Sequence, residues 1–205
     1  MNIQVFNQSS IKLEGEKIIY FDPYLLKEEK HDADIIFITH DHYDHFEEES
    51  INKAMNDKTV LVVPTILKEQ ATKLTTNILL VEPNKTYTLE DITFDTICSY
   101  NKESPYHPKE KNYVGYNLEI NGKRYYIMGD TDRTIETDQV KTDVCFVPIG
   151  GTYTMTVDEA INYINSIKPK KAIPIHYGSI VGDINLGTSF KEKINKEIEV
   201  EILIK

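Results

Sequence analysis

Four side chains of the kinds that bind metal ions fall close together in this chain: His40, His42, Asp44 and His45. They follow residues 35–38, an isoleucine-rich apolar segment typical of a buried strand. Alternate residues of an extended segment point the same way, so His40 and His42 can reach one metal ion. Asp44 and His45 come where the chain must turn, and they can face a second position. Neutral imidazole and carboxylate are ligands of Zn²⁺ and of other first-row divalent ions.

The alternative for this run is a solvated loop before a helix, with Asp44 as the helix cap. The chain has six histidines, and three of them lie in this one run. Few physical reasons other than ligation gather imidazoles directly after a buried strand. The pattern therefore favours a metal site.

At these residues the sequence resembles the metallo-β-lactamase superfamily of metal-dependent hydrolases. The resemblance extends over nearly all of the chain, and it is closest to a small branch related to ascorbate-6-phosphate lactonase-like proteins. It implies three further metal ligands in the second half of the sequence. These are His107 in segment 104–109, Asp130 in segment 126–132 and His176 in segment 173–178.

The local evidence for these three residues is uneven. His107 lies in the polar segment 100–112, where a solvated loop histidine is equally consistent with the composition. Asp130 ends a strand pattern, and an ordinary Gly-Asp turn is the alternative. His176 directly follows the apolar residues 171–175, which repeats the order of strand and then histidine seen in the first motif.

The resemblance also implies how the ligands are shared between two divalent metal ions. The first ion would take His40, His42 and His107, the second Asp44, His45 and His176, and Asp130 would bridge them. Such a pair of ions lowers the pKa of a bridging water, and the resulting hydroxide attacks a carbonyl carbon or a phosphorus atom. Asp44 would help to orient that nucleophile. Zn²⁺ is the first expectation, and Mn²⁺, Fe and Ni²⁺ accept the same ligands.

Further residues near these motifs have candidate supporting roles. Asp22 ends the strand pattern 17–22; the resemblance implies that it supports the metal loop, and a plain turn residue is the alternative. Three tyrosines beside the ligand segments are candidates to donate a proton or hold the substrate: Tyr43, Tyr153 and Tyr177. Lysines around the third ligand, Lys102, Lys109 and Lys111, form either a solvated rim or an attraction for an anionic substrate.

The composition limits the partners that we expect. A formal net charge of −10 disfavours nucleic acid, which needs a basic face, and no apolar run is long enough to span a membrane. The expected partner is a small-molecule substrate. Cys98 and Cys145 lack ligand neighbours, and two reduced thiols together with the absence of a signal pattern predict a cytoplasmic protein.

A length of 205 residues fits one domain, 1–205. The expected strands are 2–6, 9–14, 17–22, 35–38, 60–63, 78–81, 92–99, 114–120, 124–128, 143–147, 171–175 and 198–204. Four helices are expected: one directly after Glu47, one over residues 65–74, one after a capping box at Thr156 and Glu159, and one over residues 188–196. Residues 84–90 are expected to be a turn-rich connection, and Asn121-Gly122 to close a hairpin. The patterns give mixed α/β, and the resemblance implies a four-layer α/β/β/α sandwich.

The main hypothesis is a hydrolase with a dinuclear site that cleaves a small ester, lactone or phosphodiester. One alternative is a nuclease or a cyclic-nucleotide phosphodiesterase, which the acidic charge disfavours. A second is a metal-dependent metabolite-binding protein without catalysis, which the full ligand set disfavours. A diiron oxygen- or NO-reducing role is disfavoured because the resembling enzymes carry Glu where this chain has His42. The oligomeric state is not readable from the sequence.

Overall fold

The computed structural model describes residues 1–204, which fall into two compact units, Met1–Glu82 and Pro83–Lys205. Residue 205, the last of the predicted domain 1–205, lies outside the described residues. Each unit is a sheet with helices of its own, so the predicted mixed α/β class with two sheets is confirmed. That the whole chain behaves as one domain stays a prediction.

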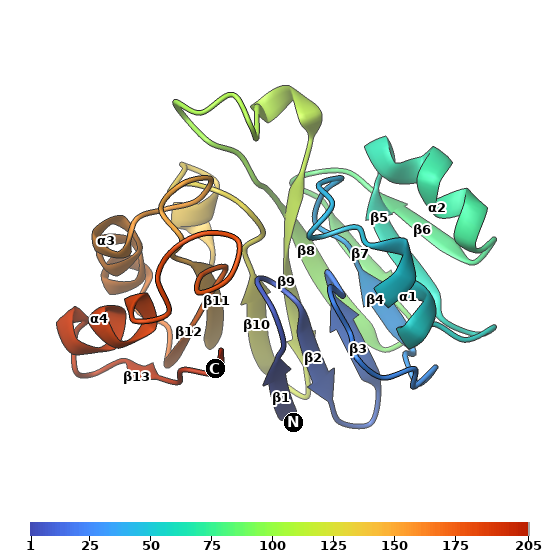
Figure 1. Ribbon diagram of the computed structural model, residues 1–205, viewed down its shortest axis with the longest axis horizontal. Helices are drawn as coiled ribbons and strands as arrows, with labels where there is room; N and C mark the ends of the chain where they lie inside the picture. Colours follow the sequence, from blue (N-terminus) through green and yellow to red (C-terminus); the bar gives the residue numbers. More distant parts are fainter. Residues whose placement is uncertain (205) are drawn as a thin grey trace. The chain divides into compact units, whose positions relative to one another are not determined.

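The first unit is built on a six-stranded sheet whose strands lie in chain order (Figure 1). They are β1 (Asn2–Val5), β2 (Ile11–Glu14), β3 (Ile18–Phe21), β4 (Ile35–Phe37), β5 (Val60–Pro64) and β6 (Ile78–Val81). The first three strands pair antiparallel, and β3 to β6 pair parallel. The carboxyl ends of β3 and β4 therefore meet at one edge, which is where open sheets with parallel strands carry their binding groups.

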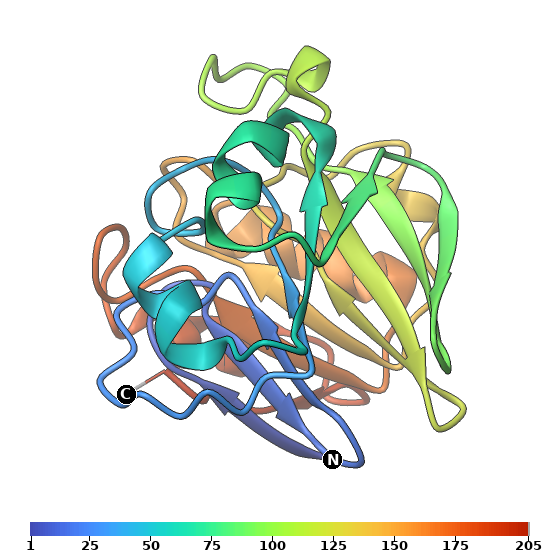
Figure 2. The same ribbon diagram turned by 90° about the vertical axis from the view of Figure 1, so that its right-hand side faces the viewer.

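Helical segments cover one face of this sheet: α1 (Glu48–Ala54), the 3₁₀ turn Thr65–Leu67 and α2 (Lys68–Leu74). Figure 2 shows α1 and α2 on the same side of the strands of this unit. Ile51 of α1 and Ala71 of α2 belong to one apolar cluster with Ile36 of β4 and Leu61 of β5. Burial of this cluster is what fixes the strands that precede the first ligand segment.

The second unit is built on a seven-stranded sheet in the order β13-β12-β11-β10-β9-β8-β7. Its strands are β7 (Thr86–Leu89), β8 (Ile92–Cys98), β9 (Val114–Ile120), β10 (Lys123–Ile127), β11 (Val144–Pro148), β12 (Lys171–Ile175) and β13 (Glu199–Val200). Strands β10 to β13 pair parallel, while β7 to β10 pair antiparallel. In this pattern β8, β10 and β12 run the same way, so their carboxyl ends share one edge.

The helices of the second unit are α3 (Val157–Ile167) and α4 (Leu186–Lys193), with 3₁₀ turns at Lys109–Lys111 and Thr137–Gln139. The predicted capping box is confirmed, because Thr156 accepts from the Glu159 amide and the Glu159 carboxylate accepts from the Thr156 amide. Buried Tyr163 of α3 donates its hydroxyl to the Thr137 carbonyl at 3.1 Å, which fastens the 3₁₀ turn to the helix.

Two expectations for secondary structure were wrong. The turn-rich connection 84–90 contains β7, whose strand character comes from its antiparallel pairing with β8 over Thr86 to Leu89. The last strand is two residues, Glu199–Val200, because only these pair with β12. The other predicted strands and helices are present, with shifts of at most three residues at their ends.

Two further expectations concern the thiols and the membrane. Cys98 and Cys145 are both buried, and neither forms a disulfide within residues 1–204. Across residues 1–204 the structure contains no helix with the length and apolar character needed to cross a membrane.

Candidate metal centre

The ligand segment of the first unit leaves the sheet beside an acidic residue. Asp22 directly follows β3, and Thr39 and His40 come two and three residues after the end of the parallel neighbour β4. The Asp22 amide donates to the Phe37 carbonyl at 3.0 Å, so the two chain ends stay joined beyond the last strand pair. This pairing holds the start of the ligand segment in a fixed place.

The buried Asp22 carboxylate organises this segment through three hydrogen bonds. It accepts from the Thr39 amide at 2.8 Å, from the Thr39 hydroxyl at 2.7 Å and from His45 Nδ1 at 2.7 Å. The predicted supporting role of Asp22 is therefore confirmed within this unit. Thr39 has an equal share in it, and no local sequence signal distinguished that threonine.

These bonds determine which nitrogen each imidazole offers to a metal ion. Because Asp22 is an acceptor, His45 must carry its proton on Nδ1, which leaves the lone pair on Nε2. The Thr39 hydroxyl gives its one hydrogen to Asp22, so at 2.9 Å it accepts from His40 Nδ1. His40 and His45 therefore both present Nε2, an orientation that hydrogen-bond acceptors at Nδ1 commonly give to ligating histidines.

The four predicted ligands of the first unit lie together. The ring centroid of His40 lies 4.6 Å from that of His42 and 3.9 Å from that of His45. The Asp44 carboxylate lies 3.6 Å from His45 Nε2, the nitrogen that carries the lone pair. Burial raises the pKa of the Asp22 carboxyl, and its bonds to His45 and Thr39 oppose that rise.

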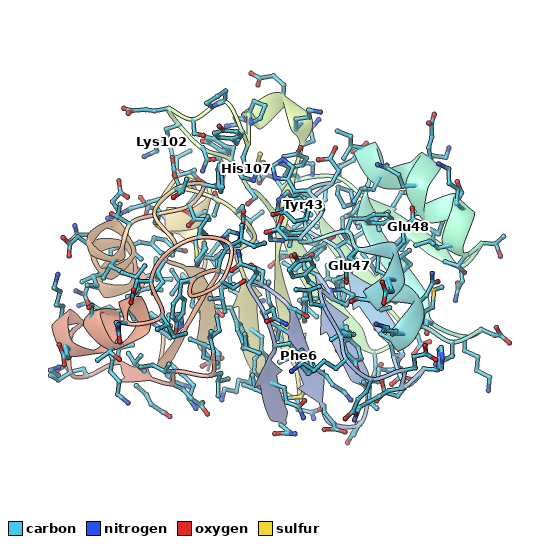
Figure 3. All side chains as sticks on the ribbon, in the orientation of Figure 1. Phe6, Tyr43, Glu47, Glu48, Lys102 and His107 are labelled. Atoms are coloured by element: carbon cyan, nitrogen blue, oxygen red, sulfur yellow. The ribbon has the colours of Figure 1, made fainter. Side chains whose placement is uncertain are left out.

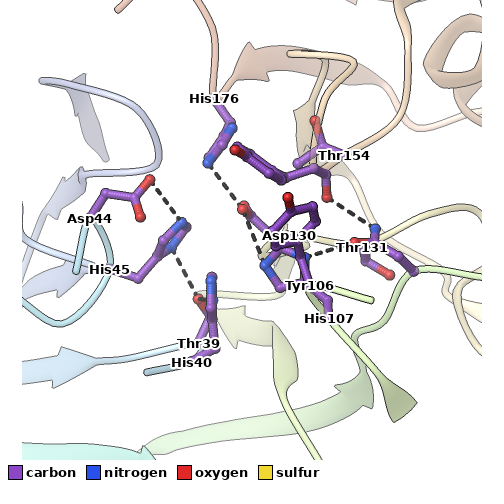
Figure 4. Close-up of polar contacts among 12 residues, drawn as sticks. Thr39, His40, Asp44, His45, Tyr106, His107, Asp130, Thr131, Thr154 and His176 are labelled. Atoms are coloured by element: carbon purple, nitrogen blue, oxygen red, sulfur yellow. Dashed lines mark hydrogen bonds and ion pairs between the residues drawn. The ribbon is translucent and has the colours of Figure 1, made fainter. Parts of the chain in front are cut away.

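In the second unit, three segments that leave the shared edge of the sheet bring the other predicted ligands together. His107 follows β8, Asp130 follows β10 and His176 follows β12. The Asp130 Oδ2 atom lies 3.0 Å from His176 Nε2 and 3.6 Å from His107 Nε2 (Figure 4). All three side chains are buried, so the alternative that His107 is a solvated loop residue is excluded.

The spacing of these atoms fits a shared metal ion. Two ligand atoms at about 2.0–2.2 Å from one ion lie roughly 3.0–3.5 Å apart in octahedral to tetrahedral geometry. The separations of Asp130 from His107 and His176, and of Asp44 from His45, fall in or close to this range. The chemistry of each set, imidazole and carboxylate without thiolate, suits a first-row divalent ion.

His107 is oriented by a carboxamide that sequence reasoning missed. Asn101 Oδ1 lies 2.7 Å from His107 Nδ1, while Asn101 Nδ2 donates to Asp132 Oδ1 at 3.1 Å and to the Tyr153 carbonyl at 3.0 Å. Because both Nδ2 partners are acceptors, the amide orientation is determined and Oδ1 must accept from Nδ1–H of His107. His107 therefore presents Nε2. The only signal in the sequence is a polar residue six positions upstream, which is too weak to single out.

Asp130 and His176 depend on close backbone contacts. Gly129 has φ +66°, a left-handed conformation that glycine adopts without strain, and it sets the turn into Asp130. The Ser99 hydroxyl lies within hydrogen-bond distance of the Met128 carbonyl, at 3.0 Å, and of the Asp130 carbonyl, at 3.2 Å. A Cβ atom on Gly150 would collide with the His176 carbonyl oxygen, so the backbone of His176 is packed directly against this glycine.

The three candidate tyrosines have different surroundings. Tyr43 is 65% exposed (Figure 3), and Tyr153 packs edge-on against the Tyr106 ring, with centroids 4.7 Å apart. Tyr177 is fully buried, and its hydroxyl lies against Gly187 of α4. This packing gives Tyr177 a structural role, while a catalytic role for Tyr43 or Tyr153 stays a prediction.

The basic residues around His107 are not equivalent. The Lys109 ammonium forms an ion pair with Glu136 at 2.5 Å and lies 4.7 Å above the Tyr100 ring, so its charge is already neutralised. Lys102 and Lys111 are exposed. His31 is exposed.

Comparisons with known proteins agree with this ligand chemistry. A sequence model of the beta-lactamase superfamily domain matches residues 2–176. A metal-dependent hydrolase of Staphylococcus saprophyticus is 32% identical, over 99% of this chain and 96% of its own. A metal-dependent hydrolase of Thermoplasma acidophilum is 31% identical, over 80% of this chain and 78% of its own.

Solved structures show the same fold. A crystal structure of a provisionally named metal-dependent hydrolase from Parabacteroides distasonis has a TM-score of 0.82 and 27% identity, covering 99% of this chain and 93% of that one. A metallo hydrolase of Ignicoccus hospitalis has a TM-score of 0.77 at 20% identity, covering 98% and 93% of the two chains, a likeness of fold alone.

Proposed function

The chain belongs to the beta-lactamase superfamily and is a metal-dependent hydrolase, and we propose that it cleaves a small ester, lactone or phosphodiester at a pair of divalent metal ions. One observation carries the proposal: His40, His45 and His107 each have Nδ1 bonded to a fixed acceptor and so present Nε2 as the ligand nitrogen. Imidazoles oriented in this way are prepared for a metal and have no evident structural use.

We propose that all seven ligand residues act together. By the resemblance, one ion would be held by His40, His42 and His107 and the other by Asp44, His45 and His176, and Asp130 would contribute to both. The fit of the ligand spacings inside each unit supports this assignment. The donor set is compatible with Zn²⁺ first, and with Mn²⁺, Fe or Ni²⁺.

When bound, the two ions supply a hydroxide near neutral pH and polarise the bond that it attacks. The chain itself supplies the remaining steps. Asp44 is expected to orient the nucleophile. Asp22 and Asn101 keep His45 and His107 in the ligating tautomer throughout the cycle. Lys109 already forms an ion pair with Glu136. Of the three lysines around His107, we therefore expect the exposed Lys102 and Lys111 to attract an anionic substrate.

The first test is the metal content of protein purified without chelator, measured by elemental analysis together with variants from each unit. We expect about two ions per chain, and loss of metal in His45→Ala and in His176→Ala. The exposed His31→Ala variant is the matched control and is expected to keep both ions. Metal content that stays at two ions in either ligand variant would contradict the assignment.

The second test is turnover by the metal-loaded chain on panels of lactones, carboxylic esters and phosphodiesters, with Asp130→Ala as the matched inactive variant. We expect hydrolysis of at least one class that Asp130→Ala abolishes. Tight binding of such compounds without product formation would favour a binding protein instead. The two reduced thiols support our expectation that this activity is cytoplasmic.

A further inference from the structure

The exposed apolar side chains of this protein are concentrated on the segments that carry the predicted metal ligands. Single exposed hydrophobic residues are ordinary on a protein surface, but their concentration beside a functional site points to a ligand. In residues 1–204, every large hydrophobic side chain of high exposure except Met1 lies on a segment that bears a predicted ligand or the supporting Asp22. In the first unit these are Leu25 and Tyr43, and in the second Tyr106, Ile135, Ile180 and Ile184.

Leu25 of the first unit is held in an unusual backbone conformation. Its φ is +50°, in the left-handed region where the Cβ atom of a leucine crowds its own backbone. The side chain is 51% exposed, so its burial does not offset the strain. A strained residue that adds little to the core indicates a use outside the fold itself.

Three side chains fix the backbone around Leu25. The consecutive amides of residues 24–26 donate in turn to Ser10 Oγ at 3.1 Å, to the Glu47 carboxylate at 2.8 Å and to Ser50 Oγ at 2.9 Å. Ser50 also donates its hydroxyl to Glu47. Leu25 is therefore anchored to the start of α1, which follows the ligand segment 40–45 in the chain. A side chain on a backbone fixed in this way is prepared for a binding contact.

Tyr24 connects Leu25 to the ligand segment. Its ring meets the ring of Tyr43 edge-on, with centroids 6.2 Å apart. Tyr43 lies between His42 and Asp44 in the chain and is largely exposed. Leu25, Tyr24 and Tyr43 therefore form a small apolar patch in the first unit, beside two of the predicted ligands.

The size and surroundings of this apolar patch favour a small molecule as its occupant. A stable protein interface buries roughly 800 Å² on each partner, which one exposed leucine and one exposed tyrosine cannot provide. Glu47, which binds the Leu25 amide, is followed by Glu48 and Glu49, and the chain carries a net charge of −10. These charges repel an anionic membrane surface.

We propose that the apolar patch binds the part of the substrate that does not react, and that this part is an alkyl chain. The inference rests on the proposed function and narrows its substrate class to esters and lactones that carry such a chain. A fully buried methylene group strengthens binding about fourfold, so a chain on the patch gives the site a preference for longer substrates. An anionic group elsewhere on the substrate, as Lys102 and Lys111 would favour, is compatible with this chain.

The first experiment measures binding without turnover. Cyclopentanone and 2-butylcyclopentanone resemble a lactone ring without and with an alkyl chain, and neither has an ester bond to cleave. Both are titrated into the zinc-loaded full chain while NMR follows the methyl signals of Leu25. We expect the butyl compound to bind at least tenfold more tightly, as partial burial of four carbon groups allows, and to shift the Leu25 signals. Equal affinities, or Leu25 signals that do not move, would overturn the proposal.

Variants test whether Leu25 carries the preference. Leu25→Asn keeps the left-handed backbone, which asparagine tolerates, and removes the apolar contact. We expect it to lose the tenfold preference and Leu25→Met to regain most of it. Leu79→Asn, at a partly exposed position of β6, is the matched control and should keep the preference. A folded Leu25→Asn protein with the full preference would contradict the proposal, and the Leu25 signals of the unaltered chain decide the question if that variant does not fold.

Turnover separates this proposal from the proposed function. Equal kcat/KM for p-nitrophenyl acetate and p-nitrophenyl hexanoate would overturn the alkyl-chain proposal and leave the hydrolase function in place. Binding of 2-butylcyclopentanone through Leu25 in a chain that cleaves no ester, lactone or phosphodiester would do the reverse. Binding to phosphatidylcholine vesicles that Leu25→Asn abolishes, with no preference between the two ketones, would overturn the proposal in favour of a lipid surface.

Discussion

Replacing Asp22 by Asn separates metal affinity from folding in this protein. The two side chains have the same shape, but an amide has one acceptor end and one donor end. Asp22 now accepts from the Thr39 amide, the Thr39 hydroxyl and His45 Nδ1. In either orientation of the new carboxamide in Asp22→Asn, its NH₂ end would face at least one of these donors. The simplest relief moves the His45 proton to Nε2, which removes the ligand lone pair.

The magnitude follows from these contacts. A buried donor that faces another donor costs about 1–3 kcal/mol. Loss of an outer partner of a metal ligand weakens metal binding about 10- to 100-fold, which is roughly 1.4–2.8 kcal/mol. The free energy of unfolding of the metal-free chain should fall by less than this. Burial raises the pKa of Asp22, so removing its charge recovers part of the desolvation cost.

The assay is competition with a chromogenic chelator for Zn²⁺, next to urea unfolding of the metal-free protein. Asp32→Asn is the matched control, because Asp32 accepts from Lys12 and from the Tyr20 hydroxyl in the same unit. We expect Asp22→Asn to lose 10- to 100-fold in Zn²⁺ affinity and the control to lose less than twofold. A folded Asp22→Asn protein with unchanged affinity would refute the tautomer reasoning.

Three further predictions concern other parts of the fold. Gly150→Ala should push the His176 backbone away and weaken Zn²⁺ binding at least tenfold in the same chelator assay, because the added methyl group collides with the His176 carbonyl. Thr156→Ala should lower the free energy of unfolding by about 1 kcal/mol in urea, since it removes the cap of α3. Asp143→Asn should lose about 1 kcal/mol at pH 7. Hydrogen bonds, first from the Arg124 amide, hold the pKa of Asp143 below its usual range, so its contribution is present above the unfolded pKa and fades as pH falls through the folded pKa. The Asp143→Asn deficit should therefore close in acid urea titrations, and a deficit that persists below both pKa values would contradict this origin.

Much of the fold could be predicted because its signals are local. The hairpin at Asn121-Gly122 and the capping box at Thr156 each depend on residues within a few positions. Strand β7 was missed because Thr86 to Leu89 is only four residues long, although threonine and tyrosine are common in strands. Its antiparallel pairing with β8 makes it part of the sheet.

The sequence by itself predicted the ligand types and their order, because imidazoles and carboxylates crowded after strand patterns have few other uses. Only the tertiary structure decided which nitrogen each imidazole offers. His45 takes its tautomer from Asp22, 23 residues upstream, and His107 from Asn101, whose amide is fixed in turn by Asp132, 31 residues away. A tautomer is set by the donors and acceptors that folding brings to the ring, and residue spacing along the chain carries no record of them.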